Sequence, residues 1–336
     1  MRVEQILLEH GSGGLLSHEL VAETFLPLLK NPYLEQLEDA AVFDSVGQRY
    51  CLTTDSYVVH PIFFPGGDIG SLAVYGTVND LAMCGGKPLF LSAAFILEEG
   101  FPMQHLERIV HSMAEAGRRA GVSIATGDTK VVPKGAADGI FITTSGIGLI
   151  SYAPRLSVRS IRQGDSVILN GPIGDHGATI LAQREDLGLS TPVRSDSAPL
   201  NGLVMKILHA SDQVHCMRDA TRGGLGAILA EIAQQAGLEI IIEEKAVLVR
   251  EEVRGICEIL GIDPLFLANE GRMAVFCASE DCEKILQCMH DHPLGQQAAV
   301  IGKVRDNKRG RLILDTIIGG SREVDLPTGE LVPRIC

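Results

Sequence analysis

Apolar and polar positions alternate along the chain with two periods, one typical of strands and one typical of helices. Short runs of apolar and β-branched residues predict strands at 50–54, 89–97, 122–126, 140–144, 166–170, 240–243, 273–278, 298–304 and 311–314. Apolar residues at helical spacing predict helices at 69–83, 102–120, 179–187, 198–210, 225–236, 249–260 and 280–290. This mixture predicts an α/β or α+β fold, and the pattern alone does not choose between them.

The pattern is interrupted between residues 151 and 164, where Pro154, Gly164 and several arginines occur without periodicity. We therefore expect an N-terminal domain over 1–150 and a C-terminal domain over 151–314, each of ordinary size. After residue 314 glycines and prolines replace apolar periodicity. That composition predicts a mobile, partly extended tail over 315–336.

The charge balance of the 336-residue chain is acidic, because 42 Asp and Glu against 29 Lys and Arg give a net charge of −13. It argues against nucleic acid or an anionic membrane as the main partner, since both require clustered cations. No apolar stretch reaches the ~20 residues that a membrane-spanning helix needs. The first residues also lack the apolar core of a secretory signal. We expect a cytoplasmic protein.

Cysteine usage indicates a reduced chain with one unusual thiol. Most of the eight cysteines lie in apolar segments, where a reduced cysteine packs as a small core residue. No CxxC pair occurs, and the spacing of Cys277, Cys282 and Cys288 does not fit a structural zinc site. Cys336 differs because it ends the chain, where a thiolate on a mobile segment can reach a reactive site as a nucleophile. The alternative is a chance exposed cysteine.

Aspartates stand beside small residues at five places, Asp39, Asp55, Asp80, Asp128 and Asp219. Scattered single carboxylates suit Mg²⁺, which prefers oxygen ligands and usually keeps water and substrate phosphates in its coordination shell. Each aspartate alone is more typical of a turn or a helix cap. Together they favour a site for a metal and a nucleotide.

Glycine-rich segments at 11–14, 174–177 and 223–226 precede predicted helices. Glycines there allow backbone N–H groups to face an anion at the positive end of a helix, and Arg222 adds a charged donor. Ordinary turn glycines are the alternative for each segment. No Walker A sequence and no strand-linked GxGxxG occurs, so the sequence does not predict a P-loop or Rossmann site.

Lys130 and Glu270 are charged residues among apolar or small neighbours. A buried lysine or glutamate is usually paired, and its pKa can then be tuned for proton transfer. A simple ion pair between two loops is the structural alternative.

Ten motifs along nearly the whole chain together resemble one family, the HypE carbamoyl dehydratases of nickel–iron hydrogenase maturation. They are HGSGG (10–14), TTDSY (53–57), FPGG (64–67), ND (79–80), ILEEG (96–100), TGDTK (126–130), GDHGAT (174–179), RDATRGG (218–224), ANEG (268–271) and PRIC (333–336). The terminal PRIC is the most specific of them. This family is similar in turn to the aminoimidazole ribotide synthetase-like ATP enzymes.

The resemblance implies a two-domain fold, a homodimer closed by paired N-terminal sheets, and ATP bound near the interface. In the family, the carbamoyltransferase HypF carbamoylates the terminal thiol. ATP then drives dehydration of the thiocarboxamide to a thiocyanate, and the cyano group passes to iron on the HypC–HypD complex. By this resemblance the chain would supply the cyanide ligand of the hydrogenase iron.

The resemblance also assigns roles to individual residues. It implies that Cys336 carries the substrate and that Glu270, alone or with Lys130, removes protons, while Lys130 could instead bind the γ-phosphate. The Mg²⁺ ligands would be Asp39, Asp55, Asp80 and Asp128. The ATP-binding set would be His10, Gly11, Gly13, Gly14, Asn79, His176, Asp219, Thr221, Arg222 and Gly223.

Other functions remain as alternatives. Selenophosphate synthetase is disfavoured because no Cys–Lys glycine loop lies near the N-terminus. Thiamine monophosphate kinase and aminoimidazole ribotide synthetase leave the Cys336 tail unexplained. A non-enzymatic carrier, in which Cys336 only shuttles a group, is the other alternative, and ATP consumption that depends on the loaded tail would distinguish the enzyme from it.

Overall fold

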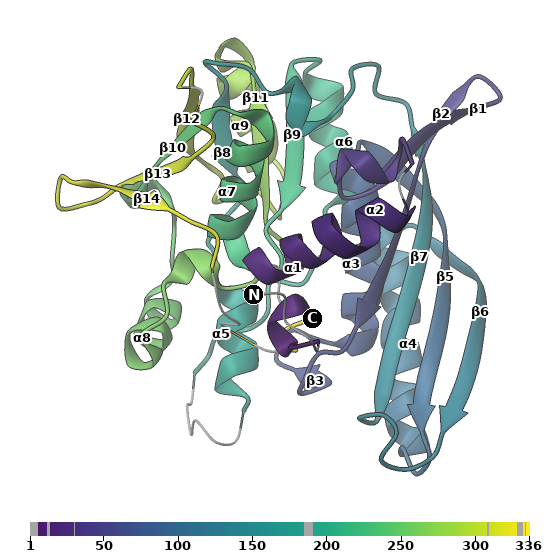
Figure 1. Ribbon diagram of the computed structural model, residues 1–336. Helices are drawn as coiled ribbons and strands as arrows, with labels where there is room; N and C mark the ends of the chain where they lie inside the picture. The colour runs from purple at the N-terminus through teal and green to yellow at the C-terminus, as the bar shows by residue number, and fades with distance from the viewer. Residues whose placement is uncertain are drawn as a thin grey trace.

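The computed structural model describes residues 6–11, 14–29, 31–184, 191–307, 309–327, 332 and 334–336. In these residues the chain builds a five-stranded sheet and a seven-stranded sheet that stand side by side, each with its own helices (Figure 1). The strands of the first sheet lie within 41–150 and those of the second within 166–324. The C-terminus lies between the two halves of the molecule.

The first sheet has the strand order β1-β2-β7-β5-β6. Its strands are β1 (Ala41–Ser45), β2 (Gln48–Tyr57), β5 (Gly86–Glu98), β6 (Ser123–Val132) and β7 (Ile140–Ile150). Buried and half-buried residues alternate along the whole of β7, as expected for a sheet with one covered face. That face is covered by α3 (Ile69–Met83) and α4 (Met103–Ala120), and the described helices leave the opposite face open (Figure 1).

Helix α3 is buried on nearly all sides because it lies between the first sheet and the second half of the molecule. Its N-terminus is fixed by a capping box, in which the Asp68 carboxylate accepts from the N–H groups of Gly70 and Ser71. The small two-stranded ladder of β3 (Phe63–Phe64) and β4 (Gly67–Asp68) leads into this cap. The helix in turn carries Asp80 into the molecule.

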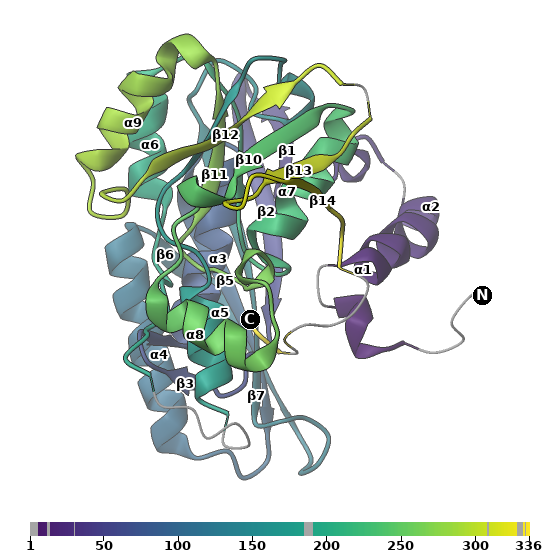
Figure 2. The same ribbon diagram turned by 90° about the vertical axis from the view of Figure 1, so that its left-hand side faces the viewer.

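The second sheet is mixed, with the order β14-β13-β10-β12-β8-β11-β9. Its strands are β8 (Ser166–Leu169), β9 (Val214–Asp219), β10 (Glu239–Glu243), β11 (Met273–Cys277), β12 (Ala299–Arg305), β13 (Leu312–Asp315) and β14 (Ser321–Val324). The helices of this half are α5 (Asp175–Ala182), α6 (Asn201–Ala210), α7 (Gly224–Ala236), α8 (Glu251–Leu260) and α9 (Cys282–His290). Strand β11, between β8 and β9, is wholly buried. Figure 2 shows α5 and α8 on the same side as the C-terminus.

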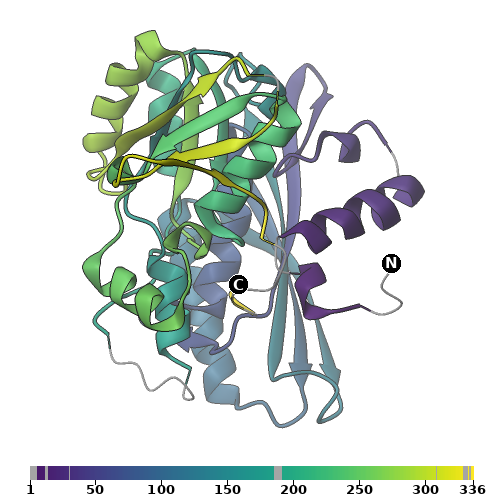
Figure 3. The same ribbon diagram turned by 60° about the vertical axis from the view of Figure 1, so that its left-hand side comes forward.

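The N-terminal segment forms α1 (Leu15–Leu20), a π-helical turn (Val21–Phe25) and α2 (Leu26–Leu29), and it projects from the body of the molecule (Figure 3). Short 3-10 turns occupy Leu8–Gly11, Leu34–Gln36, Val158–Ser160, Glu244–Ala246, Pro264–Phe266 and Ser279–Asp281. None of the described helices is long and apolar enough to span a membrane.

The structure confirms the mixed fold and most of the predicted elements, including helices 69–83 and 102–120. The helix predicted at 179–187 is wrong in its bounds, because the chain already enters α5 at Asp175 after the left-handed Gly174 and leaves it at Ala182. Strand 122–126 continues as β6 to Val132. Residues 321–324, which the sequence analysis assigns to the tail, form edge strand β14 because Leu312–Asp315 offers them an antiparallel partner. The apolar pattern does not predict β9, because His215 and Arg218 interrupt its apolar run.

Candidate active site

A cavity of about 200 Å³ opens between the two halves of the molecule. Segments from six parts of the chain meet in it: the residues before β1, the end of β2, α3, the β9–α7 loop, the loop before β11 and the C-terminus. Its lining consists of Asp39, Asp55, Ser56, Tyr57, Gly76, Asp80, Asp219, Thr221, Arg222, Glu270 and Cys336. Eight of the residues that the sequence assigned to chemistry therefore share one cavity.

The first sheet and α3 supply three carboxylates to this cavity. Asp55 lies on the side of β2 that faces α3, and its carboxylate accepts from the Tyr57 hydroxyl at 3.1 Å. Asp80 accepts from the Thr53 hydroxyl at 2.9 Å. Asp39 stands just before β1 and pairs with Arg218, with 2.8 Å between Oδ1 and Nη1. Residues of β2 thus fix Asp55 and Asp80, and Arg218 on β9 fixes Asp39.

The loop between β9 and α7 forms the opposite wall with Asp219, Thr221 and Arg222. It can turn into the helix because Gly223 and Gly224 both adopt positive φ angles, 78° and 66°. A side chain at Gly224 would also collide with the Leu265 carbonyl, since its Cβ would lie 2.5 Å from that oxygen. The positive end of α7 therefore points toward the cavity, as in many sites for phosphate.

Glu270 is buried in the loop before β11, and its Oε1 has no hydrogen-bond partner among the described residues. Its backbone is held by Asp196, which accepts from the N–H groups of Glu270 at 3.2 Å and Gly271 at 3.1 Å. Residue 271 must be glycine for this contact, because a Cβ there would lie 2.1 Å from the Asp196 carbonyl oxygen. The sequence analysis missed Asp196, which lies in a segment without periodicity, so only its position in the fold reveals it.

The end of the chain is docked in the cavity. The Cys336 carbonyl accepts from the Val58 N–H at 3.0 Å and the Arg334 carbonyl accepts from the His60 N–H at 3.1 Å, so the end of the tail lies along the residues that follow β2. Burial raises the pKa of the Cys336 thiol to about 12, although the Arg222 guanidinium opposes this shift. Arg222 is the cation beside the thiol, whereas Arg334, two residues before it, binds Asp138 and the Val58 carbonyl.

The cavity concentrates negative charge. Burial raises the pKa of Asp39 to about 6 against the pull of Arg218, and burial together with the Asp39 charge raises the pKa of Asp219 to about 8. Burial and neighbouring carboxylates also hold the pKa of Asp80 and Glu270 well above their usual range. Such repulsion between buried carboxylates is relieved when a cation binds among them.

These residues fit a magnesium–nucleotide complex better than a metal bound by protein alone. Among the described residues, no three His, Cys, Asp or Glu side chains are placed to hold a metal ion together. The Oδ2 of Asp219 and the Oε1 of Glu270 are nevertheless buried without hydrogen-bond partners in the part of the chain that the structure describes. Mg²⁺ typically takes one or two carboxylates and completes its coordination with water and phosphate oxygens.

Other residues predicted to bind ATP lie beside the cavity without lining it. Asn79 is buried, and its amide bonds to the backbone of Ala198, Glu270 and Leu200. His176 is also fully buried and contacts the tail. His10, Gly11 and Gly14 are on the N-terminal segment, and the Gly11 carbonyl accepts from Arg222. Gly223 follows Arg222 at the start of α7. Gly13 lies outside the described residues.

Asp128 and Lys130 do not reach this cavity within one chain, contrary to the predicted grouping with Asp55 and Glu270. Both lie on β6, where their side chains are 64% and 68% exposed and pair with each other at 2.5 Å. Strands β7 and β5 separate β6 from β2. Three strand spacings correspond to about 14 Å.

The strand register places the two groups on different faces of the sheet. From Asp55 the paired residues run across β7 and β5 to Gly127, so its neighbour Asp128 points the other way. Asp55 faces α3, whereas Asp128 and Lys130 lie on the open face. A sequence motif gives neither the strand order nor the register, which is why this grouping could not be tested before the fold was known.

The comparisons with known proteins agree with this arrangement. The family model of the N-terminal domain of AIR synthase related proteins matches residues 37–150, and that of their C-terminal domain matches residues 162–315. The carbamoyl dehydratase HypE of Azotobacter vinelandii is 49% identical over 336 residues, covering 100% of this chain and 98% of the relative.

Two solved structures are similar to this chain in sequence and in fold. A HypE in complex with ATP is 48% identical with a TM-score of 0.83, covering 99% of this chain and 100% of its own. A chain from a HypE–HypF complex is 49% identical with a TM-score of 0.87, covering 92% and 99%.

Fold and site thus define an AIR synthase related protein with a docked C-terminal cysteine in its interdomain cavity. Within that class, the chain belongs to the HypE family of carbamoyl dehydratases.

Proposed function

We propose that this protein uses ATP to dehydrate a carbamoyl group on the thiol of Cys336, giving a thiocyanate that supplies the cyanide ligand of a nickel–iron hydrogenase. The observation that carries the proposal is the position of the terminal thiol, which lines the same cavity as Glu270, Arg222 and the carboxylate cluster. A carrier that only shuttled a group would have no use for a buried base beside its own thiol.

The chemistry requires that the carbamoyl oxygen become a good leaving group. The oxygen attacks the γ-phosphorus of ATP, ADP leaves, and the oxygen later departs as phosphate. Loss of both N–H protons then leaves a carbon–nitrogen triple bond, so the overall change is S–CO–NH₂ plus ATP to S–CN plus ADP and phosphate. Phosphoryl transfer of this kind depends mainly on positioning and charge neutralisation.

Residues from each wall of the cavity have a role in these reaction steps. Glu270 accepts protons from the amide nitrogen, and its buried position, which raises its pKa, makes its ionised form a stronger base than a surface carboxylate. Arg222 stabilises negative charge beside the thiol, and the N-terminus of α7 faces phosphate. One or two of Asp39, Asp55 and Asp80 would hold Mg²⁺, which when bound neutralises phosphate charge.

The proposed partners follow from the family. A HypE has been crystallised with HypF, and we propose a HypF carbamoyltransferase as the enzyme that loads Cys336. We further propose a HypC–HypD complex as the cyanide acceptor and the cytoplasm as the location. The thiol must leave the cavity to meet either partner, so the backbone bonds of residues 334–336 and the contacts of Arg334 and His176 must break when the tail undocks.

A homodimer closed by the N-terminal sheets would complete the site. The open face of the first sheet exposes Leu52 (48%), Phe90 (54%) and Ile96 (43%), and apolar residues on such a face favour burial against a second sheet. The same face carries Asp128 and Lys130. We propose that a second copy brings its Asp128 and Lys130 to the cavity that these residues cannot reach within their own chain.

Mixing two inactive variants tests this arrangement. Lys130→Ala and Glu270→Gln should each be nearly inactive alone. After subunit exchange, activity should return to about a quarter of the wild-type rate, since half of the dimers are mixed and each mixed dimer has one intact site of two. If mixed samples stay inactive although exchange is demonstrated by mass, Lys130 does not act across a dimer.

ATP consumption should depend on the loaded tail. Purified protein carrying a carbamoyl group on Cys336 should form ADP in a single turnover with Mg²⁺, whereas unloaded protein should form little, because the oxygen that attacks ATP is then missing. Chelation of Mg²⁺ should stop ADP formation. Equal ADP formation by loaded and unloaded protein would identify another ATP enzyme of this class, and none from either would indicate a carrier.

A further inference from the structure

The docked tail makes one side-chain contact at the centre of the molecule. The Nε2 of His176 lies 2.8 Å from the Ile335 carbonyl oxygen, one residue before the reactive thiol. His176 is fully buried on α5, and its ring packs edge-on against Phe64. It does not line the cavity, so its contact is with the tail.

The geometry fixes the tautomer of this histidine. A carbonyl oxygen only accepts, so Nε2 must carry the proton and Nδ1 must be an acceptor in the neutral ring. The Ser195 hydroxyl, 2.8 Å from Nδ1, is therefore the donor. Ser195 Oγ in turn accepts from the Ser197 N–H at 3.1 Å. Burial lowers the pKa of His176, which agrees with a neutral ring.

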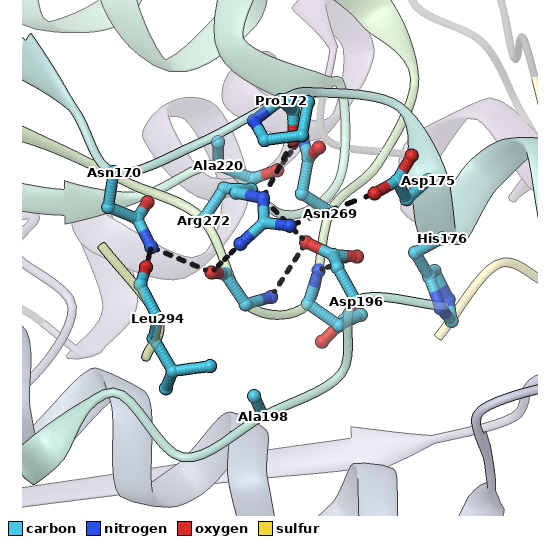
Figure 4. Close-up of polar contacts among 12 residues, drawn as sticks. Asn170, Pro172, Asp175, His176, Asp196, Ala198, Ala220, Asn269, Arg272 and Leu294 are labelled. Carbon is cyan, nitrogen blue, oxygen red and sulfur yellow. Dashed lines mark hydrogen bonds and ion pairs between the residues drawn. The ribbon is translucent and has the colours of Figure 1, made fainter. Parts of the chain in front are cut away.

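The residues after Ser195 lead directly to the backbone of Glu270. Asp196 accepts from the N–H groups of Glu270 and Gly271, and the Ala198 N–H donates to the Glu270 carbonyl at 3.3 Å. Figure 4 shows this segment between His176 and the loop before β11, with Arg272 beside Asp196. Arg272 is held by the Pro172 carbonyl at 2.7 Å and lies 3.6 Å from Asp196.

We infer that His176 is a positioning residue that holds the tail through Ile335, and that residues 195–198 connect this contact to the backbone of Glu270. This inference rests on the proposed function, because it explains how a docked tail and a correctly placed base occur together. The resemblance to the family instead groups His176 with the ATP-binding residues. Its partners are a tail carbonyl and a serine, so loss of its contacts should move the tail and leave nucleotide binding intact.

A matched pair at position 176 tests the contact with the tail. In His176→Gln the amide nitrogen can still reach the Ile335 carbonyl, whereas in His176→Asn the side chain is too short. The readout is the rate at which iodoacetamide alkylates Cys336 in unloaded protein, followed on the C-terminal peptide by mass spectrometry. Asparagine should raise this rate about fivefold, roughly the factor of one net hydrogen bond, and glutamine should raise it less. Equal rates in wild type and both variants would overturn the inference.

A second pair tests the connection to Glu270. Ser195→Ala removes the hydroxyl between His176 and Ser197, while Ser197→Ala removes a hydroxyl that has no partner among the described residues. With loaded protein, Ser195→Ala should slow dehydration about tenfold at unchanged affinity for Mg–ATP, and Ser197→Ala should match wild type. A loss of Mg–ATP affinity in Ser195→Ala or His176→Asn would return His176 to the ATP-binding set.

The two claims fail in different ways. If loaded wild-type protein does not dehydrate its tail, the proposed function is wrong, but the alkylation rates of the two His176 variants still decide whether His176 holds the tail. Thermal melting identifies any variant that does not fold. If a His176 variant does not fold, Ser195→Ala and Ser197→Ala, which each remove a single hydroxyl, provide the test.

Discussion

Cys336→Ala is expected to abolish both carbamoylation by a HypF partner and tail-dependent ATP consumption. The substitution removes only the nucleophilic sulfur, because the backbone bond from the Val58 N–H to the residue 336 carbonyl remains available to alanine. Loading is measured as the mass gained by the C-terminal peptide after incubation with HypF and a carbamoyl donor. Cys288→Ala is the matched control, since Cys288 is a partly exposed cysteine on α9 outside the cavity.

An alanine variant that still accepted the carbamoyl group would place the acceptor elsewhere in the chain. The proposed role of the tail would then be wrong, whatever the ATP measurements showed.

Glu270→Gln is expected to slow dehydration by about 10² to 10⁴, the usual contribution of a positioned general base. Glutamine keeps the size of the side chain and leaves the backbone bonds to Asp196 in place, so the loss should come from the missing base. Carbamoylation should be unaffected. The measurement is a single turnover that follows ADP and thiocyanate separately on loaded protein. Because Glu270 acts after phosphoryl transfer, ADP formation should be slowed less than thiocyanate formation.

Glu231→Gln provides the matched control. Glu231 is a partly buried carboxylate on α7 that does not line the cavity, although burial raises its pKa as well. It should dehydrate the tail at the wild-type rate. If Glu270→Gln did the same, another group would have to be the base.

The fold could be predicted from the sequence where local pattern determines structure. Helix α4 is an example, because its apolar stripe and the left-handed Gly121 at its end are both local features. The N-terminus of α5 was misplaced because a buried helix lacks a polar face to mark its start, and all of its residues are buried.

For the candidate site, too, local motifs predict some residues and only the fold reveals the others. Asp55, Asp80, Asp219, Arg222, Glu270 and Cys336 were predicted from motifs, and the structure brings all of them to one cavity. The separation of Asp128 and Lys130 depends on strand order and register, which no local pattern contains. The contact between His176 and Ile335 joins residues 159 positions apart, so only the folded chain reveals it.

The central claim is that this chain dehydrates a carbamoyl group on its own terminal thiol. The most direct test is intact-protein mass spectrometry of carbamoylated protein before and after addition of Mg–ATP, with the modified residue located on the C-terminal peptide. The account predicts that the loaded protein loses the mass of one water and that the change lies on Cys336. A loaded protein that keeps its full mass in the presence of Mg–ATP would contradict it.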